Sequence, residues 1–203
     1  WLRNGDAGGS PCEERKKPQS LLPPLSLLRD RHTASTVVAN ILDGFSGDQI
    51  FAFLPFLLFA KGMDPKVIGS FALAFTVGCF AGKMACGRLV GIFGSRKVFI
   101  TSKLLMSALL AAQGFPVIIV TSILLGIVTK GTVPVLQTLL VEPVTDPQAY
   151  DDLFAVNTFA RGSTNILTPL LFGFIASAFS AEYIYVLMAI VSVFAVAPVL
   201  FGR

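Results

Sequence analysis

Long apolar runs, separated by short polar or glycine-rich stretches, dominate the chain after residue 32. Each run is close to the ~20 residues that an α-helix needs to cross a hydrocarbon core of ~30 Å. The pattern predicts six membrane-spanning helices, over residues 36–59, 67–89, 98–114, 117–141, 153–179 and 183–201. The expected fold class is therefore an all-α integral membrane domain.

The second predicted helix carries a small residue at every fourth position, at Ser70, Ala74, Gly78 and Gly82. Residues four apart share one face of a helix. In a membrane, a ridge of small residues lets a second helix approach almost backbone to backbone. We therefore expect a close helix–helix contact along this ridge.

A basic, glycine-rich stretch follows the ridge. The glycines at 87, 91 and 94 would allow a sharp turn. Arg88, Arg96 and Lys97 would bring positive charge into it, before a new apolar run begins at Val98. A short cationic connection between two membrane helices is the simplest prediction.

Composition agrees with burial in lipid. The 203 residues are 54% hydrophobic and only 14% charged, whereas a soluble domain has about 25% charged residues. The three cysteines have no metal or redox spacing, and the single histidine offers no zinc site or catalytic dyad. No cofactor, metal or nucleic-acid partner is expected.

Residues 1–32 are polar and rich in glycine, proline and basic residues. No apolar signal-peptide region follows the charges, so we expect a cytoplasmic linker here and a transmembrane domain over residues 33–203. Because the chain begins with Trp1 and not with Met, we also expect a longer parent protein.

The distribution of Lys and Arg predicts the orientation of the helices. One side would hold the basic residues of the linker, the 88–97 stretch and Arg203, while the other would hold only Lys61 and Lys66. Both termini are therefore expected in the cytoplasm.

Four charged residues lie deep in the predicted spans: Asp43, Asp48, Lys130 and Arg161. Each such charge costs about 2.5–3.5 kcal/mol on insertion scales, which makes intramembrane charges functional candidates by default. They are the candidates for substrate or proton binding, together with Asn165, one turn after Arg161. In contrast, Lys83 and Lys103 are expected to reach the cytoplasmic interface with their long side chains.

The first predicted helix is irregular. On a regular α-helix, Asp43 and Asp48 would point about 140° apart. Gly44 and Gly47 lie between them and favour local unwinding. Such unwinding would bring both carboxylates to one cavity. Alternatively, the aspartates only hold helices together. From their depths, we expect Asp43 to pair with Arg161 structurally.

Asp48 would pair with Lys130 at the site that binds substrate or a proton. The polar positions of the first and fourth helices match, which predicts a 3+3 inverted repeat. These two helices would line a central cavity, while the third and sixth would face lipid.

The stretch from Gly87 to Lys97 is similar to a loop signature of the major facilitator superfamily: Gly, three residues, Asp-Arg, one residue, Gly and basic residues. Gly91 stands at the acidic position of this signature and Ile92 at the following basic one. Positions that match it are Gly87, Gly94, Arg96 and Lys97. Further similarity lies in residues 53–57, 61–64, 68–69, 125–134 and 168–173.

The resemblance covers residues 33–203 and corresponds to the carboxyl-terminal half of a twelve-helix transporter. It implies alternating-access movement of a small organic solute across an inner or plasma membrane, coupled to protons, with spacing closer to efflux antiporters. The implied gating loop comprises Gly87, Arg88, Gly94, Arg96 and Lys97. The implied partners are the solute, protons, the bilayer and either a missing amino-terminal half or a second copy.

A non-transporting membrane scaffold or assembly subunit is the alternative. A membrane enzyme is disfavoured, because the sequence displays no nucleophile–base pair, metal cluster or phosphate-binding loop. An isolated half is expected to insert without transporting, with its small-residue ridge facing lipid.

Overall fold

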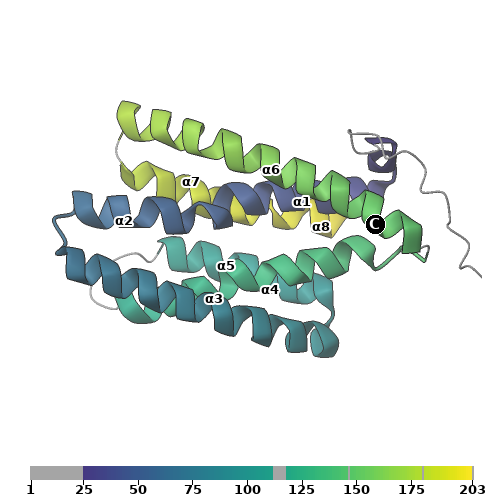
Figure 1. Cartoon of the computed structure of the whole chain (residues 1–203), viewed down its shortest axis with the longest axis horizontal. Helices are drawn as coiled ribbons and strands as arrows, with labels where there is room; N and C mark the ends of the chain where they lie inside the picture. Colours follow the sequence, from purple (N-terminus) through teal and green to yellow (C-terminus); the bar gives the residue numbers. More distant parts are fainter. Residues whose placement is uncertain (1–24, 112–117, 146, 180, 203) are drawn as a thin grey trace, which may run out of the picture.

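The computed structural model describes residues 25–111, 118–145, 147–179 and 181–202, which form helices joined by short connections (Figure 1). Most of the predicted 1–32 linker and the turn expected at 113–116 lie outside these residues. The elements are η1 (Leu25–Arg29), α1 (Arg31–Asp43), η2 (Gly44–Asp48), α2 (Ile50–Ala60), α3 (Pro65–Phe93), α4 (Ser95–Ala111), α5 (Ile118–Val141), α6 (Pro147–Ala178), α7 (Ala181–Phe194) and α8 (Val196–Phe201).

Four stretches of the described chain are long and apolar enough to cross a membrane. They overlap the first, second, fourth and sixth predicted spans. These stretches are Arg31–Ala60, Pro65–Phe93, Val120–Val141 and Tyr183–Phe201. The other two predicted spans coincide with α4 and α6. The all-helical membrane class is thus confirmed, while the count of six spans stays a prediction.

The turn predicted across Gly87, Gly91 and Gly94 is wrong in its extent. Helix α3 continues through Gly87 and Gly91 to Phe93, and only Gly94, with φ of 83°, leaves the helical region. A glycine in a helix interior costs only about 1 kcal/mol relative to alanine, so isolated glycines do not by themselves end a helix. Positive φ at Gly94 then lets α4 begin at the next residue.

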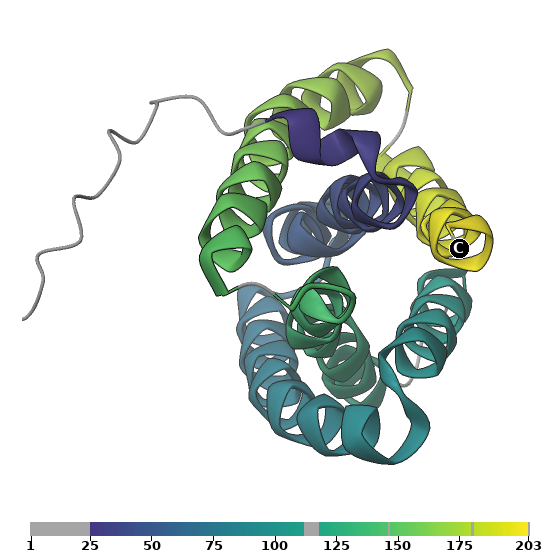
Figure 2. The same cartoon turned by 90° about the vertical axis from the view of Figure 1, so that its right-hand side faces the viewer.

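The helices lie roughly along the long axis of the molecule, in two groups that face each other (Figures 1 and 2). One group contains α1, α2, α6, α7 and α8, and the other contains α3, α4 and α5. The first helix α1 packs on α6 and α8, whereas α5 packs on α3 and α4. Contacts between α4 and α7 join the two groups.

The contact between α3 and α5 is the closest in the bundle, and it uses the predicted ridge. A Cβ atom placed on Gly78 would lie 2.1 Å from the carbonyl oxygen of Ile123, and one on Gly82 would lie 2.3 Å from that of Ile127. From the opposite side, a Cβ on Gly126 would lie 2.2 Å from the Phe75 carbonyl oxygen. The two backbones therefore touch along several turns.

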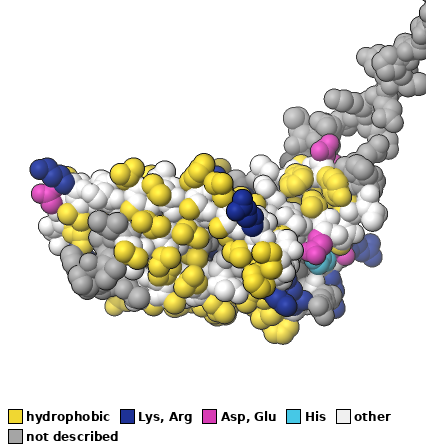
Figure 3. Space-filling view, turned by 90° about the horizontal axis from the view of Figure 1, so that it is seen from below, with side chains coloured by type: hydrophobic (Ala, Val, Ile, Leu, Met, Phe, Trp, Pro, Cys, Tyr) yellow, Lys and Arg dark blue, Asp and Glu magenta, His cyan; other side chains and the backbone are white. Residues whose placement is uncertain are grey.

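Two expectations about the surface are wrong. The ridge does not face lipid, because α5 of the same chain covers Gly78 and Gly82. Nor does α4 form a largely lipid-facing helix, since its exposed large apolar side chains are only Leu104 and Leu105. Helices α3 and α6 instead display many exposed apolar side chains. Figure 3, which views the molecule from the side of α3, shows apolar side chains spread over that long face.

Candidate functional site

A π-helical turn in the first span brings two carboxylates to one side. Helix α1 ends at Asp43, and residues 44–48 form the π turn η2, before α2 starts at Ile50. In a π-helix each bond joins residues five apart, so Asp48 stands nearly above Asp43. Both carboxylates consequently reach the guanidinium of Arg161, at 3.5 Å from Asp43 and 2.7 Å from Asp48. The predicted irregularity between the aspartates is present as a π turn. The chain stays helical there, and Asp43 is 1% exposed, so the expected opening of both carboxylates to one cavity is wrong.

Asp43 forms a sealed ion pair with Lys103 of α4. The side chains of these two residues are 1% and 0% exposed, and the Lys103 ammonium donates directly to Asp43 Oδ1. Thr132 of α5 donates to the same oxygen at 3.3 Å. The prediction that Lys103 reaches the interface is therefore wrong. Its positive charge is held in the interior because a buried carboxylate requires a partner.

Asp48 forms an open triad with Lys130 of α5 and Arg161 of α6. Lys130 Nζ lies 2.6 Å from Asp48 Oδ1, and Arg161 Nε lies 2.8 Å from Asp48 Oδ2. The side chains of Asp48, Lys130 and Arg161 are 14%, 26% and 19% exposed. We call these three residues the open triad. Unlike the sealed pair, the triad is within reach of a small molecule.

The expected pairing is thus correct for one aspartate and wrong for the other. Asp48 meets Lys130 as predicted, but it also takes most of the Arg161 guanidinium. Asp43 pairs with Lys103 instead. Its contact with Arg161, at 3.5 Å, is longer than the contact of Asp48 with Arg161, at 2.7 Å. The depth of a charged residue in the membrane is a poor guide to its partner, because depth does not indicate which helices are neighbours.

Asn40 binds the Nη1 group of Arg161, the part of the guanidinium that does not contact a carboxylate, and Asn157 supports Asn40. Arg161 Nη1 donates to Asn40 Oδ1 at 3.0 Å, and Asn40 in turn donates to Asn157 Oδ1. Asn157 precedes Arg161 by one helical turn, so the i, i+4 spacing places both on one side of α6. That spacing is a signal in the sequence that the prediction did not use. Asn165, one turn further, is exposed on α6.

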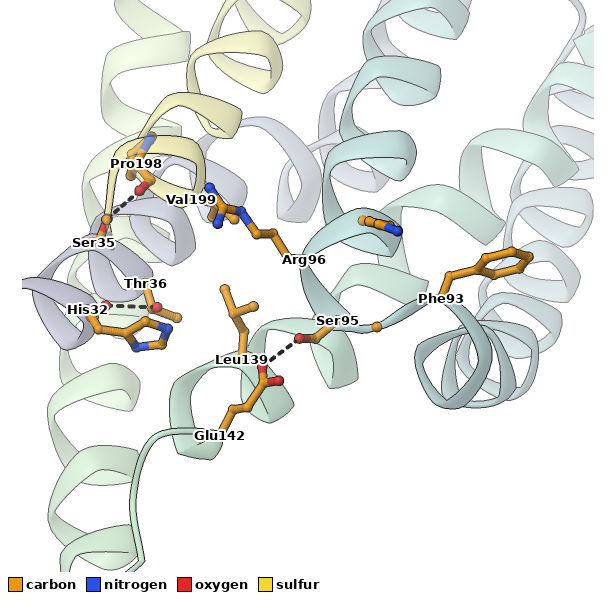
Figure 4. Close-up of a pocket in the computed structure, with 13 residues that line it drawn as sticks. His32, Ser35, Thr36, Phe93, Ser95, Arg96, Leu139, Glu142, Pro198 and Val199 are labelled. Carbon is orange, nitrogen blue, oxygen red and sulfur yellow. Dashed lines mark hydrogen bonds between the residues drawn. The ribbon is translucent and has the colours of Figure 1, made fainter.

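The predicted gating-loop residues separate into two sets. Gly94, Arg96 and Lys97 line a cavity of about 380 Å³ between the ends of α1, α4, α5 and α8 (Figure 4). Gly87 and Arg88 lie within α3 and outside that lining. The loop is accordingly shorter than the signature suggests, and its chemistry lies in the first turn of α4.

Polar contacts tie this end of the bundle together. Arg96 Nη2 donates to the carbonyl oxygen of Leu200 at 2.5 Å, and Ser95 Oγ donates to Glu142 Oε2 at 2.8 Å. Ser35 donates to the Pro198 carbonyl oxygen on the other side of the cavity (Figure 4). His32, residues 94–97, Glu142 and Gly202 therefore lie together at one end of the molecule.

Comparison with known proteins adds one finding. A family model described as Major Facilitator Superfamily matches residues 36–203, which is most of the chain. The match includes every residue of the sealed pair and of the open triad. No curated protein was found to match the chain.

Proposed function

The chain belongs to the Major Facilitator Superfamily, and we propose that it forms the carboxyl-terminal half of a proton-coupled secondary transporter for a small organic solute. The observation that carries this proposal is the open triad, a group of three partly exposed charges in the middle of an apolar bundle. Ionisable residues inside a membrane domain are expensive, and they are kept where they bind an ion or a substrate.

The positions of the triad favour alternating access. Asp48 lies midway along the Arg31–Ala60 span, and Lys130 midway along the Val120–Val141 span. In transporters built from inverted repeats, the site lies near the bilayer midplane at an interrupted helix. The π turn is such an interruption. The reciprocal packing of α1 on α6 and α8, and of α5 on α3 and α4, supports the proposed 3+3 repeat.

In this proposal Asp48 carries the proton. Protonation removes the negative charge that holds Lys130 and Arg161 together, so these two side chains become available to another ligand. Loss of the proton restores the triad. The side chains of Asp43 and Lys103 are 1% and 0% exposed, so the proposed role of the sealed pair is structural.

The other elements of the proposal follow from the architecture. The bundle would supply one wall of a cavity, and an amino-terminal half or a second copy would supply the other. Efflux is the proposed direction, across an inner or plasma membrane with both termini cytoplasmic. Gly94, Arg96 and Lys97 are the proposed gating residues, and Asn165 a further cavity residue.

Asp48→Asn in the full-length protein tests the assignment. We expect normal expression and loss of solute movement driven by a pH gradient in proteoliposomes, measured with a mixed panel of carboxylates, amines and uncharged solutes. Asp151→Asn, an exposed carboxylate at the start of α6, is the matched control and should leave transport unchanged. An unaltered pH profile in Asp48→Asn would refute the coupling role. Absence of movement of any solute by the wild type would favour a scaffold.

A further inference from the structure

We propose that the transported solute is an anion, which Lys130 and Arg161 bind in place of the Asp48 carboxylate. The inference rests on the proposed transport function and names the substrate class of the same site. A carboxylate or a phosphate monoester would satisfy the chemistry, since both present oxygens to the same donors.

The charges of the cluster do not balance. Within the described part of the chain it contains two carboxylates, on Asp43 and Asp48, and three cationic side chains, on Lys103, Lys130 and Arg161. Asp43 and Lys103 neutralise each other out of reach of solvent. The open triad is left with one carboxylate for two cations, which is a net charge of +1.

The excess positive charge of the open triad favours a negatively charged ligand. Charges in the middle of a bilayer are costly unless an opposite charge is near. With Asp48 protonated the triad carries +2; a bound monoanion would return it to +1, whereas a bound cation would raise it to +3. A cation could bind only beside Asp48, whose two oxygens already accept from Lys130 and Arg161.

The donors are arranged for an oxyanion. Arg161 directs both Nε and Nη2 at one oxygen of Asp48, at 2.8 and 2.7 Å. A guanidinium presents a planar fork that matches carboxylate and phosphate geometry. Asp48 thus already occupies the position of the ligand that we propose, and Lys130 binds its second oxygen.

The side of α6 next to Arg161 offers a further polar group. Gly162 leaves its flank of α6 open, because a Cβ placed there would meet nothing within 4 Å. Asn165 is exposed one turn after Arg161 on the same side of α6, where its amide can donate to the same anion. Lys130, with 26% of its side chain exposed, is the most accessible of the charged groups of the triad.

Anion and proton would bind together. The groups that face Asp48 are Lys130 from α5 and Arg161 from α6, with Asp43 and its partner Lys103 from α4 behind them. A proton on Asp48 frees both cations of the triad, and the anion then takes them. The two would therefore cross the membrane in the same direction, so cotransport of the anion with a proton replaces the proton-exchange efflux proposed above.

The test uses the purified full-length protein and four probes that share one ring: benzoate, phenyl phosphate, benzamide and benzylamine. Binding is measured by thermal shift, and transport by uptake into proteoliposomes. We expect benzoate or phenyl phosphate to stabilise and to be transported, and the uncharged and cationic probes to do neither.

Variants of the triad should act in opposite directions. Lys130→Gln should weaken anion binding by about tenfold or more, as expected for the loss of one charge-assisted hydrogen bond. Arg161 still pairs with Asp48 in this variant, so the fold is expected to persist. Lys130→Arg should keep the preference for anions. Asp48→Asn should tighten anion binding, because it removes the internal competitor. Lys66→Gln, an exposed lysine of α3, is the control without effect.

The outcomes separate the two proposals. Stabilisation and transport of benzamide or benzylamine alone would overturn the anion assignment and leave the transport function standing. Equal anion affinity in the wild type and in Lys130→Gln, or weaker affinity in Asp48→Asn, would also overturn it. If none of the four probes binds or moves, the anion assignment fails; the transport proposal fails as well only if no solute of the mixed panel moves.

Discussion

Replacement of Gly78 by Ala should destabilise the protein through a single methyl group. The added Cβ would lie 2.1 Å from the carbonyl oxygen of Ile123, whereas ordinary contact begins at 3.4 Å. The difference, 3.4 − 2.1 = 1.3 Å, is the least by which the atoms must separate along that line. Backbone lies on both sides, so no flexible side chain can move aside instead.

Separation at Gly78 would open the neighbouring contacts as well. Gly82 and Gly126 approach the facing backbone as closely at their own positions, and dispersion energy falls steeply with a gap of this size. Overpacking of a well-packed interior costs about 1–3 kcal/mol. Alanine is a better helix former than glycine by up to ~1 kcal/mol, which offsets a part. We expect a net loss of about 1–2 kcal/mol in the free energy of unfolding.

The assay is reversible unfolding of the full-length protein in mixed micelles with increasing sodium dodecyl sulfate, followed by far-ultraviolet circular dichroism. Gly87→Ala is the matched control on the same helix, because a Cβ there meets nothing within 4 Å. It should leave stability unchanged or raise it. The close-contact argument is refuted if Gly78→Ala is as stable as the wild type, or if Gly87→Ala loses as much.

Three further predictions concern the ion pairs, the start of α1 and the topology. Asp43→Asn should lower the yield of folded protein, because it leaves Lys103 buried without a counter-charge at a cost of about 3–5 kcal/mol. A second substitution, Lys103→Met, should restore more folded protein than Arg161→Gln does, as measured by size-exclusion chromatography. The reverse order would contradict the sealed pair. The backbone N–H of Thr33, which Asp30 caps, lowers the pKa of the Asp30 carboxyl below its usual value. A lowered pKa means that the cap stabilises the folded state above the ordinary pKa near 3.8. The protection of the Thr33 amide against hydrogen exchange, measured relative to an unfolded peptide at the same pH, should therefore fall as the pH drops below that value. A reporter fused to the carboxyl terminus should behave as cytoplasmic, and a signal from the opposite side would overturn the predicted orientation.

The features that could be predicted from sequence are those set by neighbours along the chain. Gly44 and Gly47 between two aspartates indicated an irregular turn, because the reason is local: glycine weakens the helix where the carboxylates would otherwise diverge. The ridge at Gly78 and Gly82 was predictable for the same reason, since i, i+4 spacing determines which residues share a face.

The features that could not be predicted depend on which helices are neighbours. The burial of Lys103 follows from the packing of α4 against α7 and its contact with Asp43 sixty positions away. Periodicity along α4 contains no information about that contact. The helical state of Gly87 and Gly91 was missed because a single glycine costs a helix only about 1 kcal/mol relative to alanine, which is too little to end one.

The π turn has a consequence for how length variation in this segment should be interpreted. A π turn contains one residue more than the α-helical path needs, so deletion of one residue between positions 44 and 47 would restore a continuous α-helix without breaking the chain. Because a π turn closes with five residues what an α turn closes with four, α2 would keep nearly its present orientation. Ile50 and Leu54, both fully buried, would stay in the core, and the two aspartates would become i, i+4 neighbours on one face. A one-residue gap at the π turn is therefore compatible with the site, whereas the same gap within α1 or α2 would rotate the helix beyond it by about 100°.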